Sequence, residues 1–132
     1  MTGHEGKDYG YERLMEAVLY KPHTVPELIS NEPSLLNAKN YSGETVLHWF
    51  VVENNLDIVE MLFGCGGRVD EYALTEACSL GHVDMVYLLL KNNVVPDVES
   101  CQNQMEQGEV PRKTKLKIKQ AFHRYGYELY RT

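Results

Sequence analysis

The chain has 132 residues, of which 43% are apolar, and a net charge of −6. This length predicts one domain with a modest core, and no window approaches the ~18 uninterrupted apolar residues of a membrane-spanning helix. The polar start MTGHEGKDYGYER does not resemble a signal peptide. The three cysteines are an odd number, so we expect reduced cysteines in a cytoplasmic protein rather than a disulfide framework.

The first predicted helix lies near the N-terminus. Residues 1–10 are expected to form a flexible N-terminus, and helical spacing begins near Tyr11. Apolar residues then recur at intervals of three and four, as on the buried face of a helix. These residues are Leu14, Ala17 and Val18. Pro22 is expected to end the helix because proline cannot donate the backbone hydrogen bond that continuation requires.

A short second helix is predicted to follow. Thr24 and Glu27 have the spacing of a capping box, in which each side chain accepts a hydrogen bond from a backbone N–H at the start of a helix. Pro26 fits the first helical turn, where its missing N–H costs little. Pro33 is expected to end this helix, and a turn with Gly43 comes after it.

Two later stretches are copies of one helical hairpin. TVLHWFVVENNLDIVEMLFG begins at Thr45 and YALTEACSLGHVDMVYLLLK begins at Tyr72. When the copies are superposed, most apolar positions coincide, for example Leu47 with Leu74. A unit this short cannot bury its apolar face alone, so the pattern predicts a stack of repeats that share one continuous core.

The residues around the first copy resemble the entry into an ankyrin repeat. PSLLNAKNYSGETVLH contains the turn glycine Gly43 before the Thr-Pro-Leu-His position, where this chain has Thr45-Val46-Leu47-His48. The resemblance implies that Thr45 caps the first helix and that His48 hydrogen-bonds to neighbouring backbone. It also implies an all-α solenoid of about four hairpins, in which two clear repeats are flanked by two degenerate capping repeats. The further structural positions that the family implies are Leu47, Gly81 and His82.

The repeats predict the organisation of residues 11–132. They comprise an N-terminal capping repeat at 11–40, a repeat at 41–70, a shortened repeat at 71–97 and a degenerate C-terminal capping repeat with a basic helix at 98–132. Leu14 and Leu47 are separated by 33 positions, the ankyrin period, but Leu47 and Leu74 by only 27. The shortened repeat is therefore expected to lack its projecting β-turn finger before Tyr72.

The charge is distributed unevenly. Residues 1–111 hold six Lys or Arg and eighteen Asp or Glu, whereas residues 112–132 hold seven Lys or Arg and one Glu. The apolar spacing of Leu116, Ile118, Ala121 and Phe122 predicts a helix in this basic segment, which Gly126 ends. Helix 112–124 can be the solvated face of a terminal cap or an arm that binds nucleic-acid phosphates. The acidic body would repel a polyanion, which favours the cap.

No pattern in the sequence indicates catalysis. The histidines are scattered, and the sequence contains no His-x-x-x-His or Cys-x-x-Cys pair, no phosphate-binding loop and no GxSxG. We therefore expect no enzyme activity, no metal and no cofactor. Cys78 holds a small-residue position of a repeat and is expected in the core.

Ankyrin stacks usually bind partners through a concave face built from first helices and finger tips. Superposing the repeats places three groups of residues on this face, and they form the predicted partner-binding surface. The groups are Glu16, Trp49 and Glu76 in one row, Tyr20, Glu53 and Leu80 in a second row, and Tyr41, Ser42 and Glu44 in the finger. Trp49 can equally pack between first helices, and the glutamates can be ordinary solvated surface.

An acidic surface of this kind predicts a protein partner with a basic surface. One form of this hypothesis is an immunity protein that neutralises a toxin, because small single-domain ankyrin proteins resemble those found beside bacterial toxins. The alternative function is binding of nucleic-acid phosphates by the basic helix. We expect a cytoplasmic monomer without membrane association.

Overall fold

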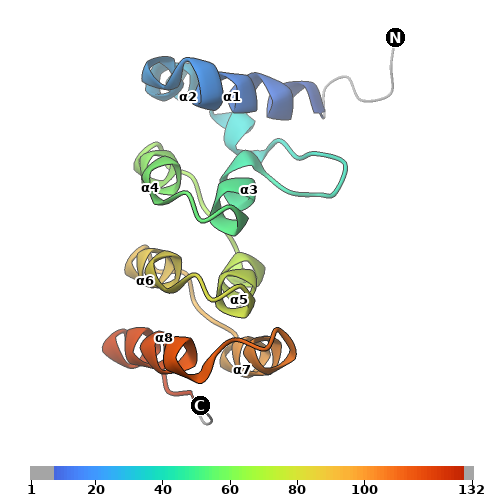
Figure 1. Cartoon of the computed structure of the whole chain (residues 1–132). Helices are drawn as coiled ribbons and strands as arrows, with labels where there is room; N and C mark the ends of the chain where they lie inside the picture. Colours follow the sequence, from blue (N-terminus) through green and yellow to red (C-terminus); the bar gives the residue numbers. More distant parts are fainter. Residues whose placement is uncertain (1–7, 130–132) are drawn as a thin grey trace. The chain divides into compact units, whose positions relative to one another are not determined.

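The computed structural model describes the backbone of residues 8–129 and the side chains of residues 10–129. This part of the chain forms eight α-helices and two short 3₁₀ helices, without a strand, so the all-α prediction is confirmed (Figure 1). The elements are α1 (Asp8–Tyr20), η1 (Pro22–Thr24), α2 (Val25–Asn31), η2 (Pro33–Asn37), α3 (Val46–Val52), α4 (Leu56–Gly64), α5 (Glu71–Ser79), α6 (Val83–Lys91), α7 (Val98–Gln107) and α8 (Arg112–Arg124).

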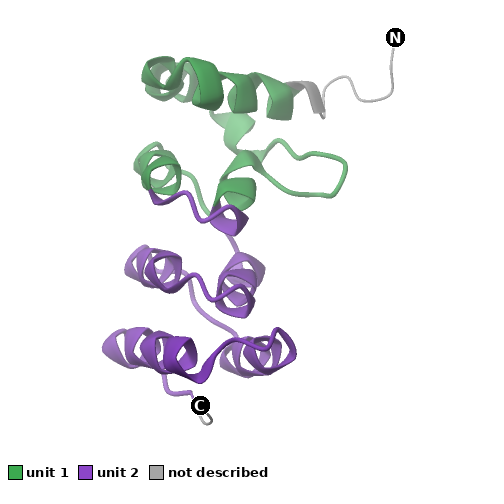
Figure 2. Ribbon diagram, viewed as in Figure 1, with its two compact units in different colours: residues 1–50, 57–68 green, residues 51–56, 69–132 purple. Residues whose placement is uncertain are grey.

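The helices group into two compact units (Figure 2). Unit 1 comprises the described residues up to 50 together with residues 57–68, and unit 2 comprises residues 51–56 and 69 onward. The boundary passes through α3, whose last two residues belong to unit 2. Each unit has its own buried apolar side chains and is described by itself below.

In unit 1, α1 packs against α2 and η2. The predicted apolar face is confirmed, since Leu14, Ala17 and Val18 are all buried. Helix α1 begins at Asp8 rather than near Tyr11, and the rest of the predicted flexible N-terminus, residues 1–7, lies outside the described residues. Gly10 lies in this first turn, and a Cβ at its position would lie only 3.1 Å from the Ala38 Cβ. The first turn of α1 is therefore held against the end of η2.

The predicted capping box at Thr24 is wrong. Thr24 has helical backbone angles and makes no side-chain cap to α2, and its hydroxyl donates instead to the Lys21 carbonyl over 2.7 Å. The reason is that η1 runs directly into α2, so the Val25 N–H is already bonded to the Pro22 carbonyl. A capping side chain needs an extended backbone at its own residue, which this continuous junction does not provide.

In unit 2, α5 packs on α6 and α7, and α6 packs on α8. The largest buried side chains at these seams are Leu74, Met85, Leu89, Met105, Ile118 and Phe122. Leu116 differs from the prediction, because it is 39% exposed. Leu116 precedes Ile118 by two residues, and positions two apart on a helix do not share a face, whereas Ile118, Ala121 and Phe122 do.

Helix α8 ends as the sequence predicts. Gly126 has a φ of 92°, its N–H bonds to the His123 carbonyl, and the Tyr127 N–H bonds to the Phe122 carbonyl. These two bonds define a Schellman motif, which satisfies carbonyls left free at a helix end. The expected absence of a finger before Tyr72 is also confirmed, since residues 65–70 join α4 to α5 without a β-bridge.

Helices α5 and α7 approach each other closely at the end of both helices. Gly108 follows α7, and a Cβ placed there would lie 2.7 Å from the Ser79 carbonyl oxygen and 3.1 Å from the Gln104 carbonyl oxygen. Both neighbours are backbone atoms, which cannot move aside as a flexible side chain can. A residue without a side chain is therefore required for α7 to lie this close to α5.

We expect Gly108→Ala to lower the free energy of unfolding by about 1–3 kcal/mol, because the added methyl group must push α7 away from α5. Chemical denaturation followed by circular dichroism measures this change. Gly64→Ala is the matched control, since a Cβ at Gly64 meets nothing within 4 Å. An equal response of both variants would contradict the close approach.

Candidate functional site

The finger of unit 1 is a hydrogen-bonded turn. Lys39 and Thr45 form an antiparallel bridge at its base, and the Asn40 side-chain oxygen accepts from the N–H groups of Ser42 at 2.9 Å and Glu44 at 3.0 Å. Gly43 has a φ of 80°, which favours glycine and confirms its predicted role in the turn. The finger is thus a built element that can present side chains at its tip.

Tyr11 connects α1 to the base of this finger. Its hydroxyl shares a hydrogen bond with the Asn40 side chain. Burial raises the pKa of Tyr11, and the bond to Asn40 acts in the opposite direction. Because Asn40 also holds the two N–H groups of the turn, α1 and the finger of unit 1 share one polar anchor.

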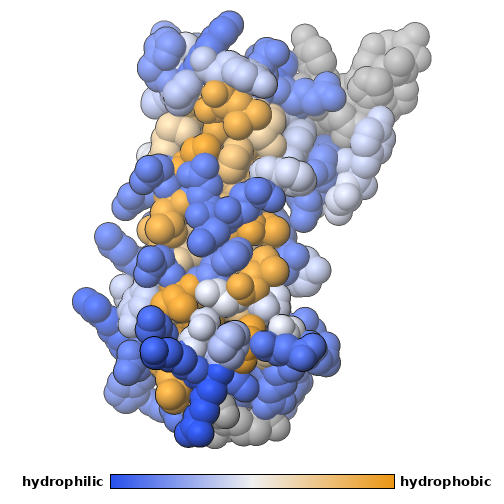
Figure 3. All heavy atoms as spheres, viewed as in Figure 1, coloured by the Kyte–Doolittle hydropathy of each residue, from blue (hydrophilic) through white to orange (hydrophobic). Residues whose placement is uncertain are grey.

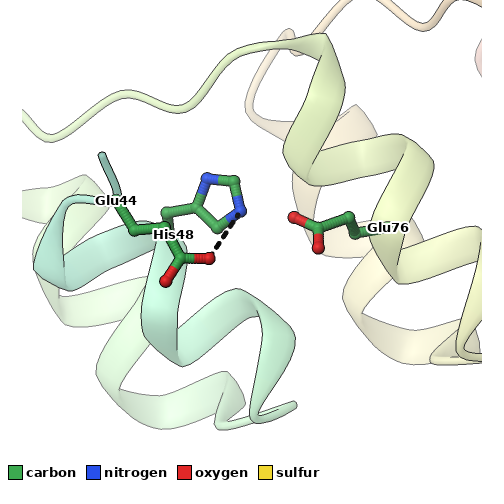
Figure 4. Close-up of side chains that lie close together, drawn as sticks. All are labelled: Glu44, His48 and Glu76. Carbon is green, nitrogen blue, oxygen red and sulfur yellow. Dashed lines mark ion pairs between the residues drawn. The ribbon is translucent and has the colours of Figure 1, made fainter. Parts of the chain in front are cut away.

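Helix α3 begins as the ankyrin resemblance implies. The Thr45 hydroxyl accepts a hydrogen bond from the His48 N–H at 3.2 Å, which is the predicted cap, and Leu47 is buried. His48 Nε2 lies 3.8 Å from a carboxylate oxygen of Glu44 (Figure 4). The structure therefore places His48 beside the carboxylate of the finger, with which a protonated imidazole would form an ion pair, and the implied bond from His48 to neighbouring backbone stays a prediction.

The predicted partner-binding residues of unit 1 mostly face solvent. Tyr41 at the finger tip is 85% exposed and Trp49 on α3 is 42% exposed. On α1, Glu16 and Tyr20 are exposed, while Glu44 is half-buried. The Trp49 side chain is therefore partly packed and partly accessible to solvent.

In unit 2, the predicted structural residues Gly81 and His82 lie between α5 and α6. Gly81 has a φ of 72°, and a ring nitrogen of His82, Nε2, lies 3.0 Å from the Val52 carbonyl oxygen. This hydrogen bond joins two segments that are 30 residues apart in the sequence. His82 thus ties the start of α6 to the last residue of α3, which also belongs to unit 2.

The predicted partner-binding residues of unit 2 are Glu53, Glu76 and Leu80. Glu53 is exposed, Leu80 is 50% exposed, and Glu76 is half-buried. Glu76 lines a groove between α5 and α7 with a volume of about 360 Å³. The groove is lined by Glu71, Tyr72, Thr75, Glu76, Ser79, Asp97, Ser100 and Gln104.

Most residues of this groove were not predicted from the sequence. The available signal was a pair of aspartates, Asp70 and Asp97, that stand 27 positions apart, like Leu47 and Leu74. Each aspartate caps a helix: Asp70 accepts from two N–H groups at the start of α5, and Asp97 accepts from the Ser100 N–H at the start of α7. Recognising them as caps would have placed α7 as a first helix beside α5.

Two buried thiols lie behind the groove. Cys78 on α5 and Cys101 on α7 share a hydrogen bond, and Cys101 Sγ lies 3.6 Å from the Thr75 hydroxyl. The hydrogen bond to Cys101 and burial together raise the pKa of Cys78 well above its ordinary value. The predicted core position of Cys78 is confirmed, since it has no exposed surface.

A basic face lies on the other side of unit 2, on α8. Figure 3 shows strongly hydrophilic side chains gathered where α8 lies at the foot of the view. The exposed basic residues of the helix are Arg112, Lys113, Lys117 and Arg124, with Lys115 and Lys119 half-buried. The first turn contains no acidic residue and no side-chain cap. Positive charge at a helix N-terminus opposes the helix dipole, so Arg112, Lys113 and Lys115 interact unfavourably with it, whereas Arg124 in the last turn interacts favourably.

The helical hairpins, the single finger and the Gly-His pair define the class of α-helical repeat proteins. The family model for ankyrin repeats (3 copies) matches residues 14–100, and the chain belongs to the ankyrin repeat family. No curated protein and no solved structure matches the chain. Ankyrin repeats generally mediate protein–protein interactions and are typically non-catalytic. Within the described residues, no helix is long and apolar enough to cross a membrane.

We expect His82→Ala to lower the free energy of unfolding by about 1–3 kcal/mol, because it leaves the half-buried Val52 carbonyl without this partner. His123→Ala is the control, since the His123–Glu128 pair is exposed on both sides and surface pairs contribute little. Thermal unfolding monitored by circular dichroism compares the two variants. A Tm of H82A equal to that of H123A would contradict a structural role for His82.

Proposed function

We propose that this chain is a non-catalytic module that binds a protein with a basic surface through an acidic and aromatic face. The face consists of exposed and half-buried residues on the first helices of the repeats, directly after these helices, and on the finger. The residues are Glu16, Tyr20, Tyr41, Glu44, Trp49, Glu53, Glu76 and Leu80. The observation that carries this proposal is the presence of solvent-accessible aromatic rings among carboxylates, at Tyr41 and Trp49 in unit 1.

Two physical features support this function. Tryptophan and tyrosine are enriched among interface residues that contribute most to binding energy, and both are rigid enough to lose little conformational entropy on binding. Carboxylates around them increase the rate of encounter with a cationic partner and disfavour anionic competitors. Eighteen acidic residues against six basic ones in residues 1–111 extend this preference beyond the contact residues themselves.

One specific form of the proposal is an immunity protein. A nuclease toxin has a cationic groove that binds nucleic acid, and an acidic protein can cover that groove. A soluble location in the cytoplasm would suit this role, because the toxin would have to be neutralised there.

The proposal predicts that Trp49→Ala combined with Glu53→Lys abolishes capture of the partner from a native lysate. The first change removes the aromatic anchor, and the second places a positive charge against a basic surface. Quantitative mass spectrometry compares proteins captured by the wild type and by the double variant. We expect at least one basic protein to be lost by about tenfold or more.

The matched control is Tyr87→Ala combined with Glu60→Lys, which makes the same two types of change on the second helices α6 and α4. Circular dichroism establishes that both double variants are folded. Retention of every basic protein by the Trp49 and Glu53 variant would exclude this face as the binding surface.

The second candidate function is binding of nucleic-acid phosphates by residues 112–124. Basic residues in the first turn of α8 favour it, because they oppose the helix dipole and therefore call for an explanation other than helix stability. The acidic remainder of the chain acts against it, since it repels polyanions.

A filter-binding titration with labelled single- and double-stranded DNA and RNA tests this alternative. Phosphate binding by α8 predicts retention at low salt that falls steeply as salt is added, and it predicts loss of retention in Lys113→Glu, Lys117→Glu. The absence of retention at low salt would eliminate the alternative.

A further inference from the structure

The outer side of α8 carries a large apolar side chain where a terminal helix is expected to be polar. The end of a repeat stack faces water, and polar residues on its outer side keep the protein in solution. Leu116 departs from this rule, because it is 39% exposed. Ile118 and Phe122 supply the buried side of the same helix, so the core of unit 2 does not cover Leu116.

The chain after α8 turns back and lies beside this helix. The Tyr127 ring packs edge-on against the Phe122 ring, with 6.5 Å between the ring centroids, and Leu129 is buried. The Glu128 carboxylate meets the exposed His123 ring, whose Nδ1 lies 2.6 Å from Oε1. These contacts hold the segment in place, and a groove lies between it and α8.

This groove has a mostly apolar surface and a volume of about 450 Å³. Long polar side chains contribute methylene groups to such a surface while their charged ends stay in water. The residues that line the groove are Leu116, Lys119, Gln120, His123, Arg124 and Glu128. A large apolar side chain of a partner would therefore bury apolar surface here.

Positive charges surround this apolar centre. At the foot of Figure 3, strongly hydrophilic side chains on α8 lie beside a small hydrophobic patch. Residues three and four positions away are the neighbours of a side chain on a helix surface. For Leu116 these neighbours are Arg112, Lys113, Lys119 and Gln120, of which three are basic. A partner that reaches Leu116 therefore approaches through a positive potential, which favours acidic partners.

Two features favour an acidic peptide over nucleic acid as the occupant of the groove. Single strands bind proteins largely by stacking bases on aromatic rings, and no Phe, Tyr or Trp stands among the described residues that line the groove. The carboxylate of Glu128 also repels a backbone that carries a phosphate at every nucleotide. An acidic peptide can place carboxylates beside the cations and still direct an apolar side chain to Leu116.

We infer that the groove on α8 docks an acidic segment of a protein partner, which inserts one large apolar side chain beside Leu116. This surface is separate from the acidic and aromatic face of the proposed function, and it selects a partner of the opposite charge. The second candidate function uses the same helix, so the test compares a peptide with DNA.

The test is a titration of isotope-labelled protein at low salt, followed by the chemical shifts of backbone amides. The probe is the peptide acetyl-Asp-Glu-Asp-Phe-Asp-Glu-Asp-amide. One comparison peptide replaces phenylalanine with serine, another replaces every acid with its amide, and an oligothymidylate carries the same number of charges. We expect saturable shifts at residues 116–128 with the probe. Each comparison ligand should bind about tenfold more weakly.

Leu116→Ala removes the apolar centre of the groove and keeps a good helix former. It should weaken binding of the probe by about fivefold or more, because less apolar surface is buried. Val95→Ala is the matched control, since Val95 is an apolar residue of unit 2 that is 63% exposed and does not line the groove. It should bind the probe like the wild type.

Lys119→Gln combined with Arg124→Gln removes two charges from the groove and should weaken binding by about tenfold. Lys115→Gln combined with Lys117→Gln removes two charges from the same helix outside the groove. This control should bind within about twofold of the wild type, because salt screens charges that do not contact the peptide. Circular dichroism verifies that all four variants are folded.

Five results would overturn the inference. They are the absence of saturable shifts with the probe, equal binding of the three peptides, equal weakening by a groove variant and its control, tighter binding of the oligothymidylate, and a dimer in sedimentation equilibrium that Leu116→Ala dissociates. The last result would mean that a second copy of the chain covers the groove. None of these measurements involves Trp49 or Glu53, so the lysate capture result stands or fails independently.

Discussion

The packing of α5 on α7 organises unit 2. Gly108 allows the two helices to approach until its Cα faces the Ser79 carbonyl, and Thr75 and Cys101 meet in the buried seam behind. Protein interiors are close-packed, so a larger residue at Gly108 would displace a whole helix. With the seam fixed, side chains from α5 and from the start of α7 line one groove.

Local hydrogen bonds set the polarity of that groove. Hydroxyl side chains on helices commonly donate to carbonyls three or four residues earlier, and Thr75 and Ser79 both do so. The finger of unit 1 is likewise held by side chain–backbone hydrogen bonds. The Asn40 side-chain oxygen accepts from two backbone N–H groups, and the turn that they form exposes Tyr41 at its tip. In both units, polar side chains bond to the backbone of their own segment and so fix its local structure.

Sequence reasoning succeeded where one periodic pattern decides the outcome. The apolar spacing predicted α1 and the buried face of the repeats, and turn chemistry predicted Gly43 and the end of α8 at Gly126. It failed where two elements meet. The capping box at Thr24 satisfied a sequence rule, yet η1 runs into α2 without the extended residue that the rule assumes. Leu116 was predicted to share the buried face of Ile118, Ala121 and Phe122, but it lies on another side of the helix and is exposed.

The sequence by itself determined the family, the helical class, the single finger and the surplus of acidic residues, because each depends on residues close together in the chain. Only the tertiary structure decided that residues of α5 and of the start of α7 line one groove, and that Gly108 lies against the Ser79 carbonyl. Those properties depend on which helices pack together. Neither can be read from periodicity, because spacing specifies the face of a helix but not the neighbour that covers it.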